Sequence, residues 1–408
     1  MTILPFLLLL AGLPTPQTQF LGLLLPLWVA VPGRVNALSF SRYSGLNERT
    51  FRRWMHRALP WHRLCVTLLH ILMGCGAINR HLILTIDATF IPKAGRETYG
   101  LGKFWNSCAG RAQRGLELSC IALMTSVGHH VFPISVRQTR PKTEKQDRLQ
   151  QYLDQLRALY RLQRSWLSAH VCIAVADGQY AKKMFFDFFA DEGVAFVTKL
   201  AVNANLLIPF TGTHPKRRGK RRKWEKKVDF RDFTGWTPVP GEDNEQVWTK
   251  VVWAPHFTRF LRVVVIQRLD RRGQVLGHVV LCCTDTTKPA EHIRALYSAR
   301  FQLEFVFRDA KQHAALTTGQ MRSKKALENH WNAAFLTVSL VRAEQLLQQT
   351  ARTGRPASSL VFSMEDAKRR AFNALFASRI LANLALSHRF PELEKDPSRP
   401  LDLGVKSA

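Results

Sequence analysis

Three carboxylate residues occupy positions at which a negative charge needs a specific partner. Asp87 lies inside the apolar run LTIDATF, Asp177 ends the run HVCIAVADG, and Glu304 lies in the helical stretch YSARFQLEFVFRDAK. An ionised carboxylate is costly to bury unless it pairs with a cation or binds a metal. For a single strand aspartate the plain alternative is a satisfied hydrogen bond. Two such aspartates in one sheet, together with a helical glutamate, favour a site for a hard divalent cation.

The helical stretch around Glu304 carries a second pattern. Tyr297, Arg300, Glu304 and Lys311 stand at offsets of 0, 3, 7 and 14. At about 100° per residue they fall within an arc of roughly 60° on one helix face and spread over about 21 Å along the axis. A carboxylate flanked by cations and a phenol could bind a metal and follow a phosphate backbone. The alternative is an amphipathic helix with an Arg300–Glu304 ion pair.

The elements that would position these residues alternate from His81 onward. Apolar patterns predict strands at 82–91, 116–126, 131–138, 170–178 and 194–200. Helical patterns lie between them at 143–166 and 179–190. This order predicts an α/β core with a mixed sheet, in which Asp87 lies within a strand and Asp177 at a strand end.

Residues 201–288 interrupt this alternation with short strand-like runs and a strongly basic segment. HPKRRGKRRKWEKK (214–227) contains nine Lys or Arg and one Glu, with Lys220, Arg221 and Arg222 at its centre. We interpret the region as a β-rich insertion whose basic loop contacts DNA. A solvated loop or a nuclear-type signal is the alternative. From Pro289 helical patterns return and persist almost to the end.

A basic helical pair precedes the core. Residues 34–63 hold seven arginines against the single acid Glu48, and ALSFSRYSGLNERTFRRWMH has the outline of a helix-turn-helix. Gly45 suits the turn because it tolerates positive φ, and Asn47 can cap the second helix. The expected inward positions are Phe40, Leu46, Phe51 and Trp54. The expected DNA-facing positions are Arg49, Arg52 and Arg53. A basic helical pair without a role in DNA binding is the alternative.

The N-terminus and the cysteines bear on location. The Leu-rich runs at 3–13 and 20–32 are each shorter than a bilayer span needs, and no Lys or Arg precedes the first run as in a signal peptide. We expect a buried helical hairpin, with a membrane anchor or signal as the alternative.

The seven cysteines are an odd number, mostly in apolar surroundings such as SCIAL and HVCIAV. This is typical of reduced core thiols and predicts a cytoplasmic protein.

The overall charge narrows the class of partner. Lys and Arg total 59 against 30 Asp and Glu, which gives a formal net charge of +29. A chain this basic is expected to bind polyanions, and nucleic acid is the first candidate.

The length of 408 residues is too great for one ordinary hydrophobic core, so two or three domains are expected. A hydrophobic content of 46% excludes a wholly disordered chain.

The helix pattern resembles a known family. Tyr-x2-Arg-x3-Glu-x6-Lys is similar to the YREK signature of DDE transposases of bacterial insertion sequences, a cut-and-paste subgroup. The order of strand Asp, strand-end Asp, β-rich insertion and helical Glu is similar too, as are the strings LTIDATF, VADGQYAKK and NHWNAAF. The resemblance covers roughly residues 35–385. It implies an RNase H-like catalytic core with the β-rich insertion, flanked by N-terminal and C-terminal helical regions.

The resemblance also implies roles for residues. Asp87, Asp177 and Glu304 would be the catalytic triad that holds two Mg²⁺ or Mn²⁺ ions, one activating the nucleophile and one stabilising the leaving oxygen. The phosphates near the DNA end would be bound by Tyr297, Arg300 and Lys311. Cleavage would pass through a hairpin, which needs a flipped base held by an aromatic face. Candidates for that face, each of which could instead belong to the core, are Trp224, Trp236, Trp248 and Trp253.

The partners and domains follow from the same resemblance. We expect a homodimer that binds double-stranded DNA, both transposon ends and target, associated with the bacterial nucleoid and without a membrane. The expected domains are an N-terminal helical DNA-binding region at 1–80, the first part of the core at 81–200, the insertion at 201–288, the Glu helix with C-terminal helices at 289–390, and a flexible tail at 391–408. One alternative is a non-catalytic DNA-binding protein, such as a domesticated or decayed copy. Another is a membrane-associated basic protein.

The net charge generates a first prediction. Binding to duplex DNA should weaken steeply as salt is raised, because each neutralised phosphate releases condensed counterions. The measurement is fluorescence anisotropy of a labelled duplex over a series of salt concentrations. An affinity that does not change with salt would contradict the assignment of DNA as the partner.

Overall fold

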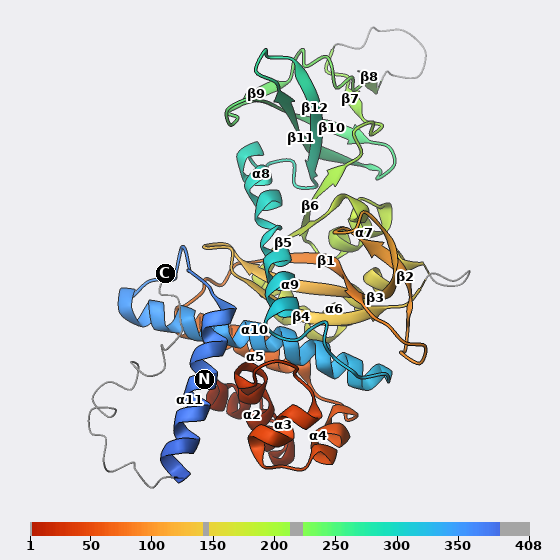
Figure 1. Ribbon diagram of the computed structural model, residues 1–408. Coiled ribbons are helices and arrows are strands. Elements are labelled where there is room, and N and C mark those ends of the chain that lie inside the picture. The colour runs from red at the N-terminus through yellow and green to blue at the C-terminus, as the bar shows by residue number, and fades with distance from the viewer. Residues whose placement is uncertain (1, 142–146, 213–222, 384–408) are drawn as a thin grey trace. The chain divides into compact units, whose positions relative to one another are not determined.

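The computed structural model describes residues 2–141, 147–212 and 223–383, with side chains described up to residue 378. These residues group into two units (Figure 1). The first unit combines Met1–Arg80, Ala88–Gln155 and Gln302–Ala408, and the second combines His81–Asp87 and Leu156–Phe301. The chain therefore passes between the units within strand β1 (Leu82–Pro92), within helix α6 (Arg148–His170), and between helices α8 (Ala290–Ala299) and α9 (Gln302–Gln312). The proposed tail at 391–408 lies outside the described residues.

A mixed sheet forms the second unit. Its strands are the first part of β1, then β5 (Val171–Ala176), β6 (Ala195–Leu200), β7 (Leu207–Pro209), β8 (Trp224–Lys227), β9 (Thr237–Val239), β10 (Glu245–Ala254), β11 (Arg259–Leu269) and β12 (Val275–Cys283). They lie in the order β1-β5-β6-β12-β11-β10-β7-β8, and β9 pairs with β10. The pairs β1–β5 and β5–β6 are parallel, whereas β6–β12 and the pairs beyond it are antiparallel. The prediction of an α/β fold with a mixed sheet is confirmed.

Apolar side chains explain why β5 and β6 lie in the middle of this unit. β5 reads VCIAVA, and every residue except Cys172 is buried, as expected for a parallel strand covered on both faces. The prediction that Cys172 is a core thiol is wrong, because this position faces solvent while its neighbours face the core. A 3₁₀ turn (Gly178–Tyr180) follows β5 and leads to helix α7 (Lys183–Asp191), whose Phe189 ring stacks on Phe196 of β6 at 4.8 Å. Helix α8 packs against β5, β6, β11 and β12.

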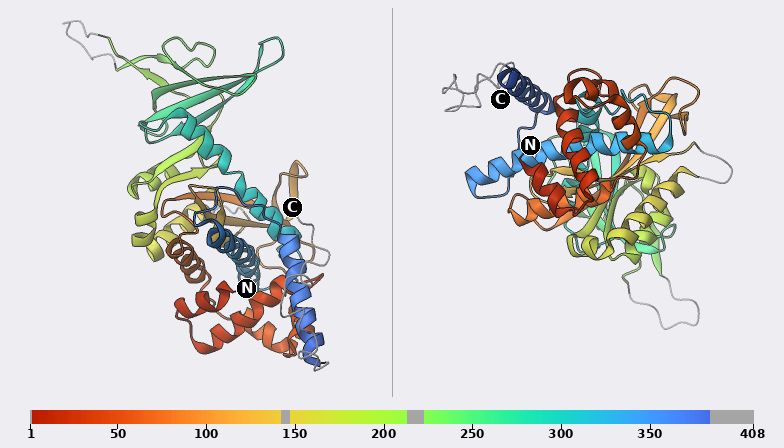
Figure 2. Two further views of the ribbon diagram at one scale, coloured as in Figure 1. Left: turned by 90° about the vertical axis from the view of Figure 1, so that its left-hand side faces the viewer. Right: turned by 90° about the horizontal axis from the view of Figure 1, so that it is seen from below.

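Helices dominate the first unit. They are α1 (Ile3–Leu10), α2 (Thr15–Ala30), α3 (Ala37–Ser44), α4 (Glu48–Met55), α5 (Trp61–Gly74), the start of α6, α9, α10 (Lys324–Thr353) and α11 (Met364–Asn383). The long helix α10 contacts α2, α4 and α5, and the N-terminal helices gather along it (Figure 2). The indole of Trp28 on α2 lies 5.1 Å from the His330 ring of α10 and donates a hydrogen bond of 2.9 Å to the Ala314 carbonyl.

The Leu-rich N-terminus forms two helices that contact each other. Leu7 and Leu21 are buried, whereas Phe6, Leu9 and Leu10 are exposed on the outer side of α1. Among the residues that the structure describes, no helix has both the length and the apolar character required to cross a bilayer.

Antiparallel strands complete the first unit. β3 (Arg111–Thr125) pairs with β2 (Gly102–Asn106) and with β4 (Val131–Thr139), and α10 packs on β4. β2 was not predicted from the sequence, because a run of five residues, GKFWN, is too short to show a period. Buried Glu117 of β3 accepts a hydrogen bond of 2.5 Å from the Tyr152 hydroxyl and lies 3.3 Å from the Arg148 guanidinium. This cluster fixes the start of α6 against β3.

One buried amide ties α10 to the N-terminal helices. Asn329 is 1% exposed, and its Oδ1 accepts a hydrogen bond of 2.7 Å from the Trp61 indole. Its Nδ2 donates to the carbonyls of Met55 at 2.7 Å and Arg57 at 2.8 Å, at the end of α4. The side chain therefore satisfies two buried polar groups, the Trp61 indole and the Met55 carbonyl, and the part-buried Arg57 carbonyl.

Replacement of this amide should destabilise the protein strongly. We expect Asn329→Ala to lower the free energy of unfolding by about 3 kcal/mol, because three hydrogen bonds are lost and their partners stay buried. Asn332→Ala is the matched control. Its amide is half-buried and donates mainly to the Glu328 carbonyl of the preceding turn, so the loss should stay below about 1 kcal/mol. Urea unfolding followed by circular dichroism measures both, and equal losses would contradict the role given to Asn329.

Candidate active site

Two aspartates lie on neighbouring parallel strands, Asp87 in the middle of β1 and Asp177 directly after β5. The register of β1 against β5 runs to the pair Ile86–Ala176, and Asp87 and Asp177 are the next residues on the two strands. Because Ile86 and Ala176 are partners in the register, the two aspartates that follow them occupy neighbouring positions. The backbone of Asp177 is held in place by Thr198 of β6, whose hydroxyl donates a hydrogen bond of 3.0 Å to the Asp177 carbonyl.

Helix α8 supplies a partner to each carboxylate. The Tyr297 hydroxyl donates a hydrogen bond of 3.0 Å to Oδ1 of Asp177. The Arg300 Nη1 lies 2.9 Å from Oδ2 of Asp87 and forms an ion pair with it. The two donors are three residues apart, so they leave the end of α8 on the same side, with the Arg300 guanidinium 5.6 Å from the centre of the Tyr297 ring.

The electrostatics of this cluster keep Tyr297 protonated. Burial raises the pKa of its phenol, and the negative charge of Asp177 raises that pKa further. The phenol is therefore a hydrogen-bond donor at any physiological pH. The side chains of Arg300 and Asp87 are only 12% and 15% exposed, so the ion pair is poorly screened by solvent.

The inserted strands help to orient α8. Arg294, one turn before Tyr297, lies 2.7 Å from a carboxylate oxygen of Glu245 on β10, and both side chains are largely buried. Helix α8 also packs directly on β11 and β12. The positions of Tyr297 and Arg300 thus depend on strands that follow residue 200. Neither Thr198 nor Arg294 stood out in the sequence, because an isolated Thr in a strand or Arg in a helix has many possible roles.

Glu304 and Lys311 lie on a different helix from Tyr297, in the first unit. The expectation of one continuous helix is wrong, since α8 ends at Ala299 and α9 begins at Gln302. At the break the Phe301 amide bonds three residues back to the Ser298 carbonyl at 3.1 Å, which tightens the last turn and ends the α-helical ladder. Glu304 occupies the first turn of α9 and is half-buried, whereas Lys311 occupies its last turn, where burial lowers the pKa of its ammonium.

The donor set at the strand ends suits a hard divalent cation. Asp87 and Asp177 offer carboxylate oxygens from adjacent strands, which is the ligand type that Mg²⁺ and Mn²⁺ prefer. Within the described parts of the chain, no group of three His, Cys, Asp or Glu side chains is assembled that could hold a metal ion. The structure therefore brings two of the three expected ligands together in one unit and leaves Glu304 as a proposed third.

The expected helix-turn-helix residues lie on α3 and α4. Gly45 joins the helices with φ of +76°, and the Asn47 side chain caps α4 by accepting a hydrogen bond of 2.8 Å from the Arg49 amide. The prediction that the side chains of Phe40 and Phe51 face inward is confirmed, because both are buried. Trp54 is half-buried. The same prediction is wrong for Leu46, which is 42% exposed. Leu46 lies in the turn just before the cap, outside either helix.

The basic residues of α4 face solvent, as the sequence analysis expected. The exposed side chains are Arg49, Arg52 and Arg53, of which Arg52 forms an ion pair with Glu48 one turn earlier. The predicted basic loop residues Lys220, Arg221 and Arg222 lie outside the described residues.

The four candidate tryptophans all pack against other rings. Trp224 and Trp253 stack on each other at 5.2 Å, and Trp253 also contacts Phe260. Trp248 stacks on Phe233, and Trp236 is buried. The half-buried members Trp224, Trp248 and Trp253 keep part of their surface accessible, whereas Trp236 belongs to the core.

Comparison with known proteins supplies a family. Residues 78–340 match the family described as transposase DDE domain, a span that contains both aspartates, the inserted strands, α8 and α9. No curated protein matches the chain.

A double-mutant cycle tests the buried ion pair. We expect Asp87→Asn and Arg300→Gln to show a coupling of about 2 kcal/mol in the free energy of unfolding without added metal, because removing either partner leaves the other charge buried. The control pair is Glu365 and Arg369 on α11, whose side chains are 58% and 51% exposed. Their coupling should be about 0.3–0.5 kcal/mol. Equal coupling in the two cycles would show that the Asp87–Arg300 pair is effectively solvated.

Proposed function

Because the chain belongs to the transposase DDE-domain family, we propose that it is a DNA transposase of a bacterial insertion sequence, in the cut-and-paste subgroup with the YREK signature. The observation that carries the proposal is the pair of aspartates on neighbouring parallel strands, each contacted by a member of that signature: Asp87 by Arg300 and Asp177 by Tyr297. A structural ion pair alone would not need a second carboxylate beside it.

The order of elements supports an RNase H-like catalytic core. Asp87 lies on the first strand of the second unit, Asp177 follows the parallel strand next to it, and the inserted strands β7 to β12 separate β6 from α8. We propose the domain division expected from the sequence, with 1–80 as the DNA-binding region, 81–200 and 289–390 as the two parts of the core, and 201–288 as the insertion.

We propose Asp87, Asp177 and Glu304 as the residues that hold two Mg²⁺ or Mn²⁺ ions. When bound, these ions would lower the pKa of an attacking water or hydroxyl and stabilise the charge of the leaving oxygen. The carboxylates fit this role because they are hard oxygen donors. Asp87 and Asp177 already lie side by side on neighbouring parallel strands.

The signature residues would handle the DNA phosphates. Arg300 neutralises Asp87 in the free protein, and its planar guanidinium can pair with a phosphodiester instead once that carboxylate has another cation partner. Tyr297 stays protonated and can donate to a phosphate oxygen. Lys311, partly buried on α9, would supply a further positive charge.

The reaction we propose consists of sequential phosphoryl transfers at one site. Water cuts a strand at the transposon end and releases a 3′-OH, and this hydroxyl attacks the opposite strand to form a hairpin. Water then opens the hairpin, and the 3′-OH finally attacks target DNA. A flipped base would stack on Trp224, Trp248 or Trp253, which retain accessible surface. We propose a homodimer that pairs two transposon ends on nucleoid DNA in the cytoplasm.

Cleavage of the DNA that flanks its own gene tests the function. The purified full chain is incubated with that DNA and Mg²⁺ or Mn²⁺, and products are resolved on a denaturing gel. We expect cuts at the flanking terminal repeats and a hairpin product. Glu304→Gln and Asp177→Asn should each lower the rate by at least about a thousandfold, because the charge on the reacting phosphate is then poorly stabilised.

The matched control is Glu365→Gln, which removes an exposed carboxylate on α11 and should leave cleavage unchanged. Salt-sensitive binding without cutting in either metal would contradict the catalytic function and support a non-catalytic DNA-binding protein. Cutting that survives Glu304→Gln would show that another carboxylate completes the site.

A further inference from the structure

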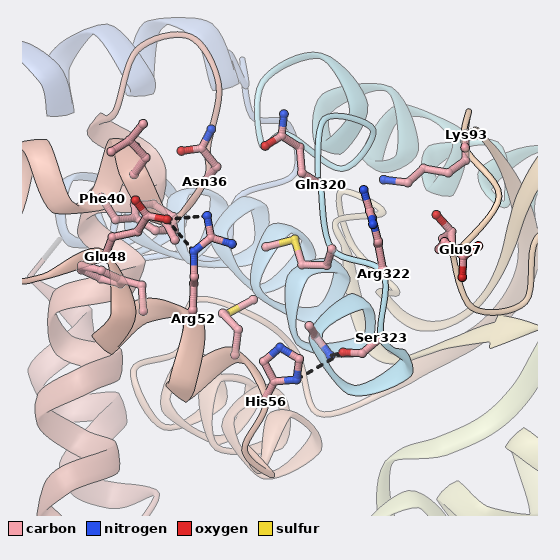
Figure 3. Close-up of a pocket in the computed structure, with 18 of the residues that line it drawn as sticks. Asn36, Phe40, Glu48, Arg52, His56, Lys93, Glu97, Gln320, Arg322 and Ser323 are labelled. Carbon is pink, nitrogen blue, oxygen red and sulfur yellow. Dashed lines mark hydrogen bonds and ion pairs between the residues drawn. The ribbon is translucent and has the colours of Figure 1, made fainter.

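A large cavity lies in the first unit, beside the α3–α4 helical pair. It has a volume of about 940 Å³ and is lined by side chains of α3 and α4, by the segment 93–98 after β1, and by the segment 320–323 before α10. Figure 3 shows Lys93 and Arg322 directed toward the same space from two different segments, with Arg52 of α4 on the opposite wall. A cavity of this size can hold a group as large as a nucleotide.

The cavity wall is rich in cations. Arg52, Lys93, Arg96 and Arg322 line it together with two carboxylates, Glu48 and Glu97. Arg52 is already paired with Glu48 on its own helix. The side chains of Arg96 and Arg322 form no hydrogen bond or ion pair with any other residue that the structure describes. Apart from the Arg52–Glu48 pair, the lining therefore holds three cations, Lys93, Arg96 and Arg322, and one carboxylate, Glu97. An anion can neutralise this excess of positive charge.

Backbone and side-chain contacts hold the two segments together before any ligand arrives. The Lys93 ammonium donates to the Gly319 carbonyl, and the Tyr99 amide donates a hydrogen bond of 2.9 Å to the Arg322 carbonyl. The next residue, Ser323, places its hydroxyl 3.2 Å from Nδ1 of His56, which follows α4. The cavity is therefore a preorganised site rather than a gap between independent loops.

The approach of Lys93 and Arg322 has an electrostatic cost. Burial lowers the pKa of the Lys93 ammonium, and the positive charge of Arg322 lowers that pKa further. Two cations in one partly buried wall repel each other, and a bound anion would reduce that repulsion.

We propose that this cavity binds a backbone phosphate of duplex DNA, with Lys93, Arg96 and Arg322 as its ligands. The proposal rests on the proposed function, and it assigns DNA contacts to residues outside both the helix-turn-helix and the YREK signature. The occupant is DNA because α4, whose Arg52 lines the cavity, also presents exposed Arg49 and Arg53. A duplex lying along α4 can place one phosphate in the cavity while its neighbours meet these arginines.

Substitution of two of the cavity cations tests the proposal in the full chain. Anisotropy of a labelled duplex carrying the terminal repeat is measured for wild type and for Lys93→Gln/Arg322→Gln over a salt series. We expect affinity to fall about 10- to 100-fold and the slope of log affinity against log salt to decrease by about 1, as for the loss of one phosphate contact. Lys93→Arg keeps the charge and should bind within about threefold of wild type.

The control for simple charge loss is Arg355→Gln, which removes an exposed arginine in the connection between α10 and α11, outside the cavity. Its affinity and salt slope should stay close to those of wild type. If the double variant binds and cuts DNA like wild type, the cavity proposal is overturned while the transposase function stands. A wild-type chain that binds no duplex would overturn both.

A free anion is the competing occupant, and a second titration separates it from DNA. Inorganic phosphate and dAMP are added to wild type and to the double variant, and binding is followed by calorimetry. We expect neither to bind as tightly as the duplex, because a single phosphate lacks the contacts along α4. Tight binding of dAMP that the double variant loses, with duplex binding unchanged, would show a mononucleotide site and contradict the proposal.

Discussion

The placement of two carboxylates on neighbouring strands, Asp87 in β1 and Asp177 directly after β5, is the constraint on which the site depends. Two like charges on adjacent strands repel each other more strongly in a partly buried site than in water. Asp87 and Asp177 directly follow Ile86 and Ala176, the last partners in the pairing of β1 with β5, so the register holds their backbones side by side. The fold must therefore provide positive charge and hydrogen-bond donors beside them.

Helix α8 meets this need, and its placement explains why the insertion matters. Tyr297 and Arg300 reach the two aspartates only because α8 packs across β5, β6, β11 and β12, with Arg294 anchored to Glu245 of β10. The inserted strands thus act on the site through the helix. The same cluster is suited to a cation and a phosphate, because Arg300 and Tyr297 can exchange a carboxylate for a phosphate oxygen without a change of protonation.

The first unit is organised around polar groups buried against α10. Asn329 joins the end of α4 and the start of α5 to that helix, and buried His330 donates a hydrogen bond of 2.8 Å from its Nε2 to the Ala315 carbonyl. Burial lowers the pKa of His330 to about 4, so its ring is neutral in the folded protein at neutral pH. These ties hold the α3–α4 pair against the segments that line the cavity, and so position the cations there.

Local patterns in the sequence determined the strands of the core, the position of Asp87 within one strand and Asp177 after another, and the spacing of the signature residues. These features were predictable because burial imposes a period that short apolar runs preserve, and because a strand-end Asp is costly unless it has a role. The sequence did not reveal the break between α8 and α9, since the residues 297–311 all favour a helix and the tight turn at Phe301 is a matter of tertiary packing. Nor could it show that Arg300 pairs with Asp87, or that Lys93 and Arg322 line one cavity. Those pairings join residues more than 200 positions apart, and only the folded chain decides which distant charges become neighbours.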